Sequence, residues 1–202
     1  CVEVGGGGVV AQGDLSDAAQ TLRVAAEVAN QVDGLDILVN NASLYEPSPI
    51  DEVTLQAWRR MQAVNVEAPM LLSQALLPKL RRRGAERVGS GSLIVHMCDI
   101  AADRPFRGYA HYCASKAALV SLVKSMAVEL APVIRCVGIA PGHVAWPPNY
   151  DESTRKRMLQ RIPQQRVGTP EEVGRLVRFL WEQGTYINGD VIRVDGGLAS
   201  RY

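Results

Sequence analysis

The chain has 202 residues, of which 47% are hydrophobic and 21% are charged, and its formal net charge is +1. This length is enough for one well-buried core, and we predict a single domain over residues 1–202. A nearly neutral chain argues against a nucleic acid or a charged membrane surface as the partner.

The cysteines and histidines give no sign of a metal site. Four cysteines and three histidines show neither a Cys-x-x-Cys pair nor any other metal-ligand spacing. The sequence has no signal-peptide pattern and no apolar run near about eighteen residues. We therefore expect no metal, a reducing compartment and a cytoplasmic location.

Five short runs of apolar residues predict strands, and amphipathic stretches between them predict helices. The strands are expected at residues 9–12, 35–40, 93–97, 134–140 and 191–194, and the helices at residues 16–31, 54–82, 111–130, 152–161 and 170–180. Such alternation is typical of an α/β fold with a parallel sheet and helices on both faces.

The beginning of the chain departs from this pattern. The chain opens at Cys1, and no helical pattern directly follows the glycines at residues 5–8, so they predict a flexible turn and not a phosphate-binding fingerprint. In a Rossmann-type sheet of order 3-2-1-4-5-6 the first two strands lie in the middle. Without them, strand 9–12 would lack a partner and strand 35–40 would become an apolar edge. We interpret the sequence as lacking its first strand–helix–strand unit.

Tyr112 and Lys116 are the first candidate catalytic pair. They stand four residues apart in a predicted helix, so the ammonium can lie near the phenol and favour its anion. Such a tyrosine can pass protons. The spacing by itself is weak, and a solvated helix face is the alternative. Asp99 strengthens the hypothesis, because it follows strand 93–97, where ligands of open parallel sheets bind. Its alternative is an ordinary turn residue.

These residues and several others resemble the short-chain dehydrogenase/reductase family. The Asn-Asn-Ala-Ser segment at residues 40–43 is similar to the family's Asn-Asn-Ala-Gly element, and Asn65 to its active-site asparagine. Asp14 resembles the adenine-contacting aspartate, and Pro141 with Gly142 the turn over the nicotinamide. The Val-Asp-Gly-Gly run at residues 194–197 is similar to the C-terminal signature. The motifs stand in the family's order over nearly the whole chain.

One departure from the family points to a subgroup. Most members have serine thirteen residues before the tyrosine, whereas this chain has Asp99. In this it resembles pteridine reductases, whose catalytic set is Asp, Tyr and Lys. The segment at residues 41–49 also resembles their Asn-Ala-Ser-x-Phe-x-Pro-Thr-Pro. By that resemblance Tyr45 stands where an aromatic ring stacks on the pterin, and Ser43 lies beside the same ligand. The chain is expected to be an NADPH-dependent pteridine reductase with one dinucleotide-binding domain.

The resemblance implies a role for each candidate residue. The catalytic residues are expected to be Asp99, Tyr112, Lys116 and Asn65, with Lys116 lowering the pKa of Tyr112 and holding the nicotinamide ribose. Cofactor binding is expected from Asp14, Leu15, Asn41, Ala42, Tyr112, Lys116, Pro141 and Gly142. Substrate binding is expected from Ser43, Tyr45, Asp99, Tyr112 and Trp146. Trp146, Met158 and Leu159 are expected to form a lid.

Several alternatives stay open. The residues that choose NADPH follow a strand that this sequence lacks, so NADH is not excluded. Dihydrobiopterin, dihydrofolate and dihydromonapterin are all candidate substrates. The rival functions are a carbonyl or 3-oxoacyl reductase of the same family and a truncated, non-catalytic relative. We also expect a homotetramer, as the family implies, because helices 54–82 and 111–130 carry more apolar residues than one sheet face can cover. These residues are Leu71, Leu72, Leu76 and Leu77 in the first helix and Leu119, Val120, Leu122, Val123 and Met126 in the second.

Overall fold

The computed structural model of the chain describes residues 8–146 and 150–200. Within these ranges, no helix has the length and the apolar content that crossing a bilayer requires. Of the glycines expected to form a flexible turn at residues 5–8, those at 5–7 lie outside the described residues.

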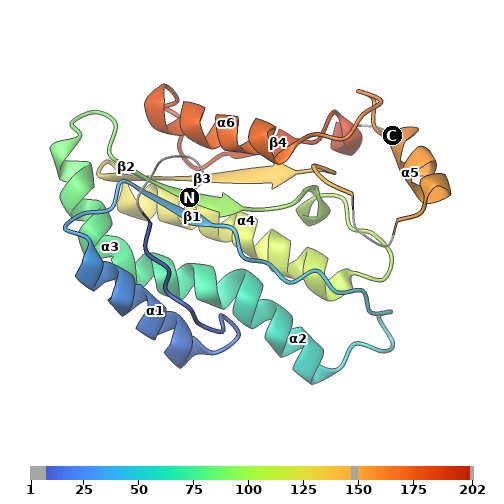
Figure 1. Cartoon of the computed structure of the whole chain (residues 1–202), viewed down its shortest axis with the longest axis horizontal. Coiled ribbons are helices and arrows are strands. Elements are labelled where there is room, and N and C mark those ends of the chain that lie inside the picture. The colour runs from blue at the N-terminus through green and yellow to red at the C-terminus, as the bar shows by residue number, and fades with distance from the viewer. Residues whose placement is uncertain (1–7, 147–149, 201–202) are drawn as a thin grey trace.

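Four strands form one parallel sheet in the order β1-β2-β3-β4 (Figure 1). The strands are β1 (Ile37–Asn40), β2 (Ser92–Met97), β3 (Ile134–Pro141) and β4 (Val191–Val194). These are four of the five predicted strands, with ends shifted by at most two residues. All four run the same way, so their carboxyl ends share one edge of the sheet.

In the described part of the chain, six α-helices accompany the sheet: α1 (Ala18–Gln31), α2 (Leu55–Gln62), α3 (Ala68–Glu86), α4 (Ala110–Leu130), α5 (Glu152–Leu159) and α6 (Pro170–Glu182). Local signals set several of their ends. Asp17 caps α1, and Thr169 with Glu172 forms a capping box at α6, where Pro170 takes the first helical position.

Successive side chains of the central strands alternate between two helical layers, because strand side chains point to opposite faces. Ile94 of β2 and Cys136 of β3 pack with α1, α3 and α4. Leu93 and Val137 lie on the other face against α6. Figure 1 shows α6 on one side of the sheet and α3 and α4 on the other. The predicted doubly wound fold with helices on both faces is confirmed.

The predicted strand at residues 9–12 is wrong. This segment has no strand pairing, and Val9 and Val10 are 74% and 87% exposed. A strand needs backbone partners, and the described strands offer this segment none. As expected, β1 is an edge strand, and it leaves Val39 42% exposed.

The helix predicted at residues 54–82 is not regular. A π-helical turn at Ala63–Glu67 separates α2 from α3, and Pro69 stands in the first turn of α3. Proline has no N–H to donate to the preceding turn, so the regular hydrogen-bond ladder is interrupted there. The turn contains Asn65, which is 1% exposed.

Most of the apolar residues that supported a tetramer pack inside the chain itself. Leu76, Leu119, Val123 and Met126 are buried in the core. Four of the other residues of this set pack against the same core, partly buried: Leu72, Leu77, Val120 and Leu122. The helices therefore cover one another as well as the sheet, which the argument from one sheet face did not consider.

Candidate active site

Asp99 lies just beyond the carboxyl end of β2 and caps a short 3-10 turn at Ile100–Ala102. Its Oδ1 accepts the backbone N–H of Ala101 at 2.7 Å. Its Oδ2 accepts the hydroxyl of Tyr112 at 2.6 Å. Tyr112 stands in the first turn of α4 and is 4% exposed. The two candidate proton-bearing residues therefore form a direct pair at the expected edge of the sheet.

The surroundings of this pair favour a protonated phenol. Burial raises the pKa of Tyr112, and the Asp99 carboxylate beside it raises that pKa further. Both oxygens of Asp99 accept hydrogen bonds, which suits the ionised carboxylate. Tyr112 thus holds a proton that a short, charge-assisted hydrogen bond orients.

The role expected for Lys116, to favour the Tyr112 anion, stays a prediction. The Lys116 ammonium donates to the Met97 carbonyl at 2.8 Å and lies 5.7 Å from the centroid of the Tyr112 ring. Burial lowers the pKa of Lys116, while Asp99 and Cys98 raise it. Burial of the phenol, followed by the Asp99 carboxylate, raises the pKa of Tyr112.

Asn65 is a hydrogen-bonding centre beneath the site. Its Nδ2 donates to the Leu44 carbonyl and to Ser115 Oγ, each at 3.0 Å. Its Oδ1 accepts from the Leu44 N–H at 2.8 Å and from Ser43 Oγ at 3.3 Å. The amide thus ties the loop after β1 to α4, which makes Asn65 a positioning residue in this geometry.

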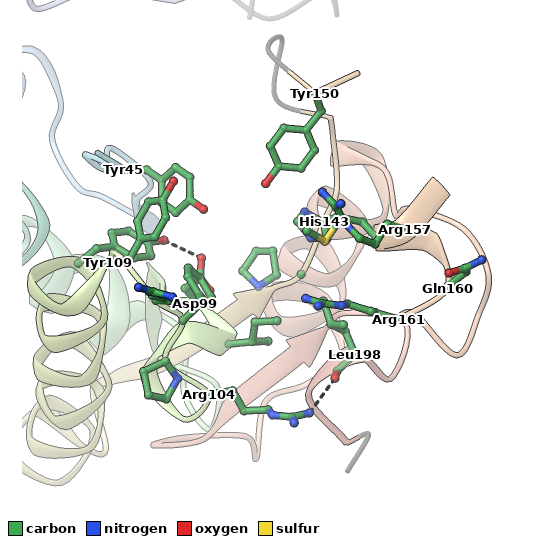
Figure 2. Close-up of a pocket in the computed structure, with 18 residues that line it drawn as sticks. Tyr45, Asp99, Arg104, Tyr109, His143, Tyr150, Arg157, Gln160, Arg161 and Leu198 are labelled. Carbon is green, nitrogen blue, oxygen red and sulfur yellow. Dashed lines mark hydrogen bonds between the residues drawn. The ribbon is translucent and has the colours of Figure 1, made fainter. Parts of the chain in front are cut away.

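A pocket of about 850 Å³ opens beside the Asp99–Tyr112 pair (Figure 2). Six residues of the predicted site and lid line it: Tyr45, Asp99, Tyr112, Pro141, Gly142 and Met158. The pocket collects residues from the turn after β2, from the end of β3, and from α4 and α5. It lies at the carboxyl ends of the strands, as expected for an open parallel sheet.

Tyr45 belongs to an aromatic cluster in this pocket. Its ring stacks on Tyr109, with centroids 4.5 Å apart and an interplanar angle of 17°. It meets Tyr112 edge to face at 4.9 Å. The Ser48 N–H donates to the Gly108 carbonyl at 2.7 Å, which joins the Tyr45 loop to the loop before α4. One face of Tyr45 is thus used by Tyr109, and 46% of the residue is exposed.

Sequence reasoning missed several pocket residues. They are Phe106, Tyr109, His143, Tyr150 and four arginines, at 104, 107, 157 and 161. Tyr109 carried a usable signal, because it precedes Tyr112 by three residues and so lies on the same side of the helix start. Arg157 and Arg161 share a similar spacing. Phe106 and His143 are in loops, whose paths periodicity does not predict.

Other predicted residues lie around the pocket and not in its lining. Trp146 contacts His143 and Tyr150, which do line it, at centroid distances of 5.7 and 6.2 Å. Ser43 lies beside Asn65. Leu159 ends α5 next to Met158, although only Met158 is a lining residue. The lid hypothesis therefore keeps Met158 and, less directly, Trp146.

The residues expected to hold a nicotinamide cofactor fit its ribose end. The Lys116 ammonium has three protons, and Met97 accepts one of them, so donors remain for ribose hydroxyls. Asn41 and Ala42 are exposed just after β1. Gly142 has a packing reason as well, because a Cβ there would meet the Asp195 backbone at 2.9 Å.

Asp14 and Leu15 lie in the coil before α1. Asp14 Oδ1 accepts the Ser16 N–H and the Ser16 hydroxyl, each at 2.8 Å. These bonds lower the pKa of Asp14, so its carboxylate is ionised and can accept a hydrogen bond from an adenine amino group. No glycine-rich phosphate fingerprint is present in this sequence.

Comparison with known proteins agrees with this geometry. A family model described as enoyl-(acyl carrier protein) reductase matches residues 2–199. Dehydrogenase/reductase SDR family member 4 of Oryctolagus cuniculus is 35% identical over 190 residues, which is 89% of this chain and 69% of that protein. The chain spans between 64% and 73% of the length of the curated relatives compared.

Solved structures share the fold closely. A short-chain dehydrogenase/reductase from Serratia marcescens has a TM-score of 0.85 and 32% identity, covering 98% of this chain and 79% of that one. The Pseudomonas aeruginosa RhlG/NADP active-site complex has a TM-score of 0.83 and 31% identity, covering 93% and 75%. With the family model over nearly all residues and the Asp99, Tyr112 and Lys116 arrangement, these likenesses show that the chain belongs to the short-chain dehydrogenase/reductase family.

Proposed function

We propose that this protein is an NADPH-dependent reductase that delivers a hydride to a pterin ring, acting as one dinucleotide-binding domain. The observation that carries the proposal is the 2.6 Å hydrogen bond between Asp99 and Tyr112. A carbonyl needs one proton donor, whereas the ring nitrogens of a pterin present several polar atoms. A carboxylate and a phenol side by side suit such a polar ring edge.

The nicotinamide supplies the hydride when it is bound. The Tyr112 hydroxyl holds the proton that the reduced ring needs, and Asp99 Oδ2 orients that hydroxyl. Asp99 can also accept from an amino or ring N–H of the substrate. We propose that Lys116 holds the ribose, while Asn65 fixes Ser43 and Leu44 beside the pocket.

The aromatic cluster supports a flat substrate. Tyr45 and Tyr109 form a stacked pair at the pocket, and the outer face of such a pair is a good surface for a planar heteroaromatic ring. We propose that Tyr45 stacks on the ring, that Ser43 bonds its polar edge, and that Trp146 helps to close the pocket. The preference for NADPH is proposed on the resemblance and on the bound NADP named for the Pseudomonas structure.

The second candidate is a carbonyl or 3-oxoacyl reductase. The matching family model is described as an enoyl-(acyl carrier protein) reductase, and the rabbit relative is a dehydrogenase/reductase, so neither name points to a pterin. Asp99 argues against this candidate, because an ionised carboxylate does not polarise a carbonyl by donating a hydrogen bond. A non-catalytic relative is the third possibility.

One assay separates the three candidates. Oxidation of NADPH and of NADH is followed with dihydrobiopterin, a 3-oxoacyl thioester and a simple diketone as substrates. Turnover confined to the pterin supports the proposal. Turnover of the thioester or diketone alone favours the second candidate. Binding of NADPH without turnover of any substrate favours the non-catalytic relative.

The homotetramer and the cytoplasmic location remain proposals. The homotetramer is carried by the family resemblance, since most of the apolar residues first used to argue for it lie in the core of the chain. Light scattering at micromolar concentration tests it, and a monomeric mass would contradict it. The cytoplasmic location is carried by the cysteine pattern of the sequence.

A further inference from the structure

The pocket beside Asp99 and Tyr112 is strongly biased in charge. Four arginines line it, whereas Asp99 is its one acidic lining residue among the described parts of the chain. The chain as a whole is nearly balanced, with 22 basic and 21 acidic residues. The positive charge is therefore concentrated at this pocket, and a pocket of one sign attracts ligands of the other.

Three of these guanidinium groups form no ion pair among the described residues. Within residues 8–146 and 150–200, Arg107, Arg157 and Arg161 take part in no ion pair, whereas seven ion pairs form elsewhere. Arg157 donates to Thr154 Oγ1 at 3.3 Å. Asp99 is already engaged by Tyr112 and the Ala101 N–H. In the described part of the chain, Arg107, Arg157 and Arg161 are therefore not held in an ion pair, although Arg157 also interacts electrostatically with Asp151.

Arg104 has a different place in the pocket. Its guanidinium donates to the carbonyls of Leu198 and Ala199, each at 3.1 Å. These bonds hold the segment near the C-terminus against the loop after β2. We assign Arg104 to the wall of the pocket and not to ligand binding.

Arg157 and Arg161 lie across the pocket from the aromatic cluster (Figure 2). In Figure 2, Arg157 and Arg161 extend from the α5 side toward the interior, while Tyr45 and Tyr109 lie on the opposite side, with Asp99 between. Arg157 lies in the last turn of α5, and Arg161 lies in the turn that directly follows this helix. A volume of about 850 Å³ is enough for a ligand much larger than a two-ring pterin.

We propose that Arg157 and Arg161 form a subsite for an anionic tail of the substrate. The inference rests on the proposed function and makes it narrower. A pterin that carries carboxylates on its tail, as dihydrofolate does, would place its ring on the Tyr45 side and its carboxylates among the arginines. Guanidinium groups bind carboxylates through paired, charge-assisted hydrogen bonds. Dihydrobiopterin has an uncharged tail and gains nothing there.

The test measures binding, because binding does not depend on turnover. Dissociation constants for dihydrofolate and dihydrobiopterin are measured by calorimetry on the protein and on an R157Q/R161Q variant. The exposed Arg81 of α3 provides the matched control, Arg81→Gln, which changes charge far from the pocket lining. The double variant should raise the dissociation constant of dihydrofolate roughly tenfold to a hundredfold and change that of dihydrobiopterin by no more than about twofold. Added salt should reduce the preference for dihydrofolate.

Two results would overturn the subsite. One is equal weakening of both pterins in the double variant, and the other is no change for either. If neither pterin binds, the proposed pterin function fails, and a 3-oxo acid is compared with its methyl ester. If the protein prefers the acid and the double variant loses that preference, the anionic subsite is supported for a substrate with a different ring. Equal binding of acid and ester, or binding of none of the four ligands, refutes it.

Discussion

Tyr112 on α4 donates a 2.6 Å hydrogen bond to Asp99, which belongs to the turn after β2. The two residues are thirteen positions apart in the chain, and the fold closes that separation by packing the first turn of α4 on the 3-10 turn. A phenol that is buried and next to a carboxylate keeps its proton, because its anion would be repelled and poorly solvated. In this pair Tyr112 therefore holds a proton beside the pocket.

The variant Tyr112→Phe tests whether the Tyr112 proton takes part in the reaction. It removes the hydroxyl and keeps the ring that meets Tyr45 edge to face. We expect kcat to fall roughly a hundredfold or more, as for loss of a general acid. The free energy of unfolding should fall by only about 1 to 2 kcal/mol, since Asp99 loses one donor. Activity within a few fold of the parent protein would remove Tyr112 from the mechanism.

The variant Asp99→Ser asks which substrate class the site serves. Serine offers one oxygen where Asp99 uses two, for the Ala101 N–H and the Tyr112 hydroxyl. It can also donate to a carbonyl, which a carboxylate cannot do. We expect kcat/KM for a pterin to fall roughly tenfold or more, while a simple diketone is unaffected or improved. The ratio of the two kcat/KM values is the measurement, and an unchanged ratio would favour the carbonyl reductase.

A third variant, Tyr45→Ala, tests the aromatic cluster as the ring-binding surface. Removing the ring exposes Tyr109 and takes away the stacked pair. We expect the KM for a pterin to rise about tenfold, while the KM for the cofactor changes little. Tyr45→Phe is the control, because it keeps the ring and should behave like the parent protein. If the two KM values rise together, Tyr45 shapes the loop and not the ring-binding surface.

The fully buried His96 predicts how stability depends on pH. Its Nδ1 lies 3.3 Å from the Asn40 amide nitrogen. Burial, assisted by the nearby Lys116 charge, lowers the pKa of His96 from 6.5 to about 4. The unfolded chain therefore binds the extra proton below its own pKa, and the folded chain does not. The stabilisation is present above pH 6.5 and is lost as pH falls toward 4.

Between about pH 7.5 and about pH 5 this effect amounts to roughly 2 kcal/mol of unfolding free energy. Urea unfolding at the two pH values measures it. Because other groups also titrate in this range, the variant His96→Asn is the comparison. Between the two pH values its unfolding free energy should change by roughly 2 kcal/mol less than that of the parent protein. Parallel pH profiles for the two proteins would show that His96 is not responsible.

The sequence was sufficient for the outline of the fold. Alternating apolar strands and amphipathic helices predict a parallel sheet with helices on both faces, because each apolar face must be covered. The same patterns wrongly predicted a strand at residues 9–12. A strand forms only when a second segment pairs with it, and the sequence of one segment does not show whether such a partner exists. The apolar periodicity also predicted one unbroken helix through Asn65, because a π-helical turn changes the hydrogen-bond register without changing the composition.

The sequence also indicated the candidate catalytic residues, because Asp99, Tyr112 and Lys116 stand at spacings that a family resemblance makes specific. Only the tertiary structure decided how they are arranged. It placed the Lys116 ammonium on the Met97 carbonyl and the Tyr112 hydroxyl on Asp99. It also gathered Tyr109, Arg157 and Arg161 around one pocket. Electrostatic and packing interactions depend on distances in space, and those distances are set by the fold and not by positions along the chain.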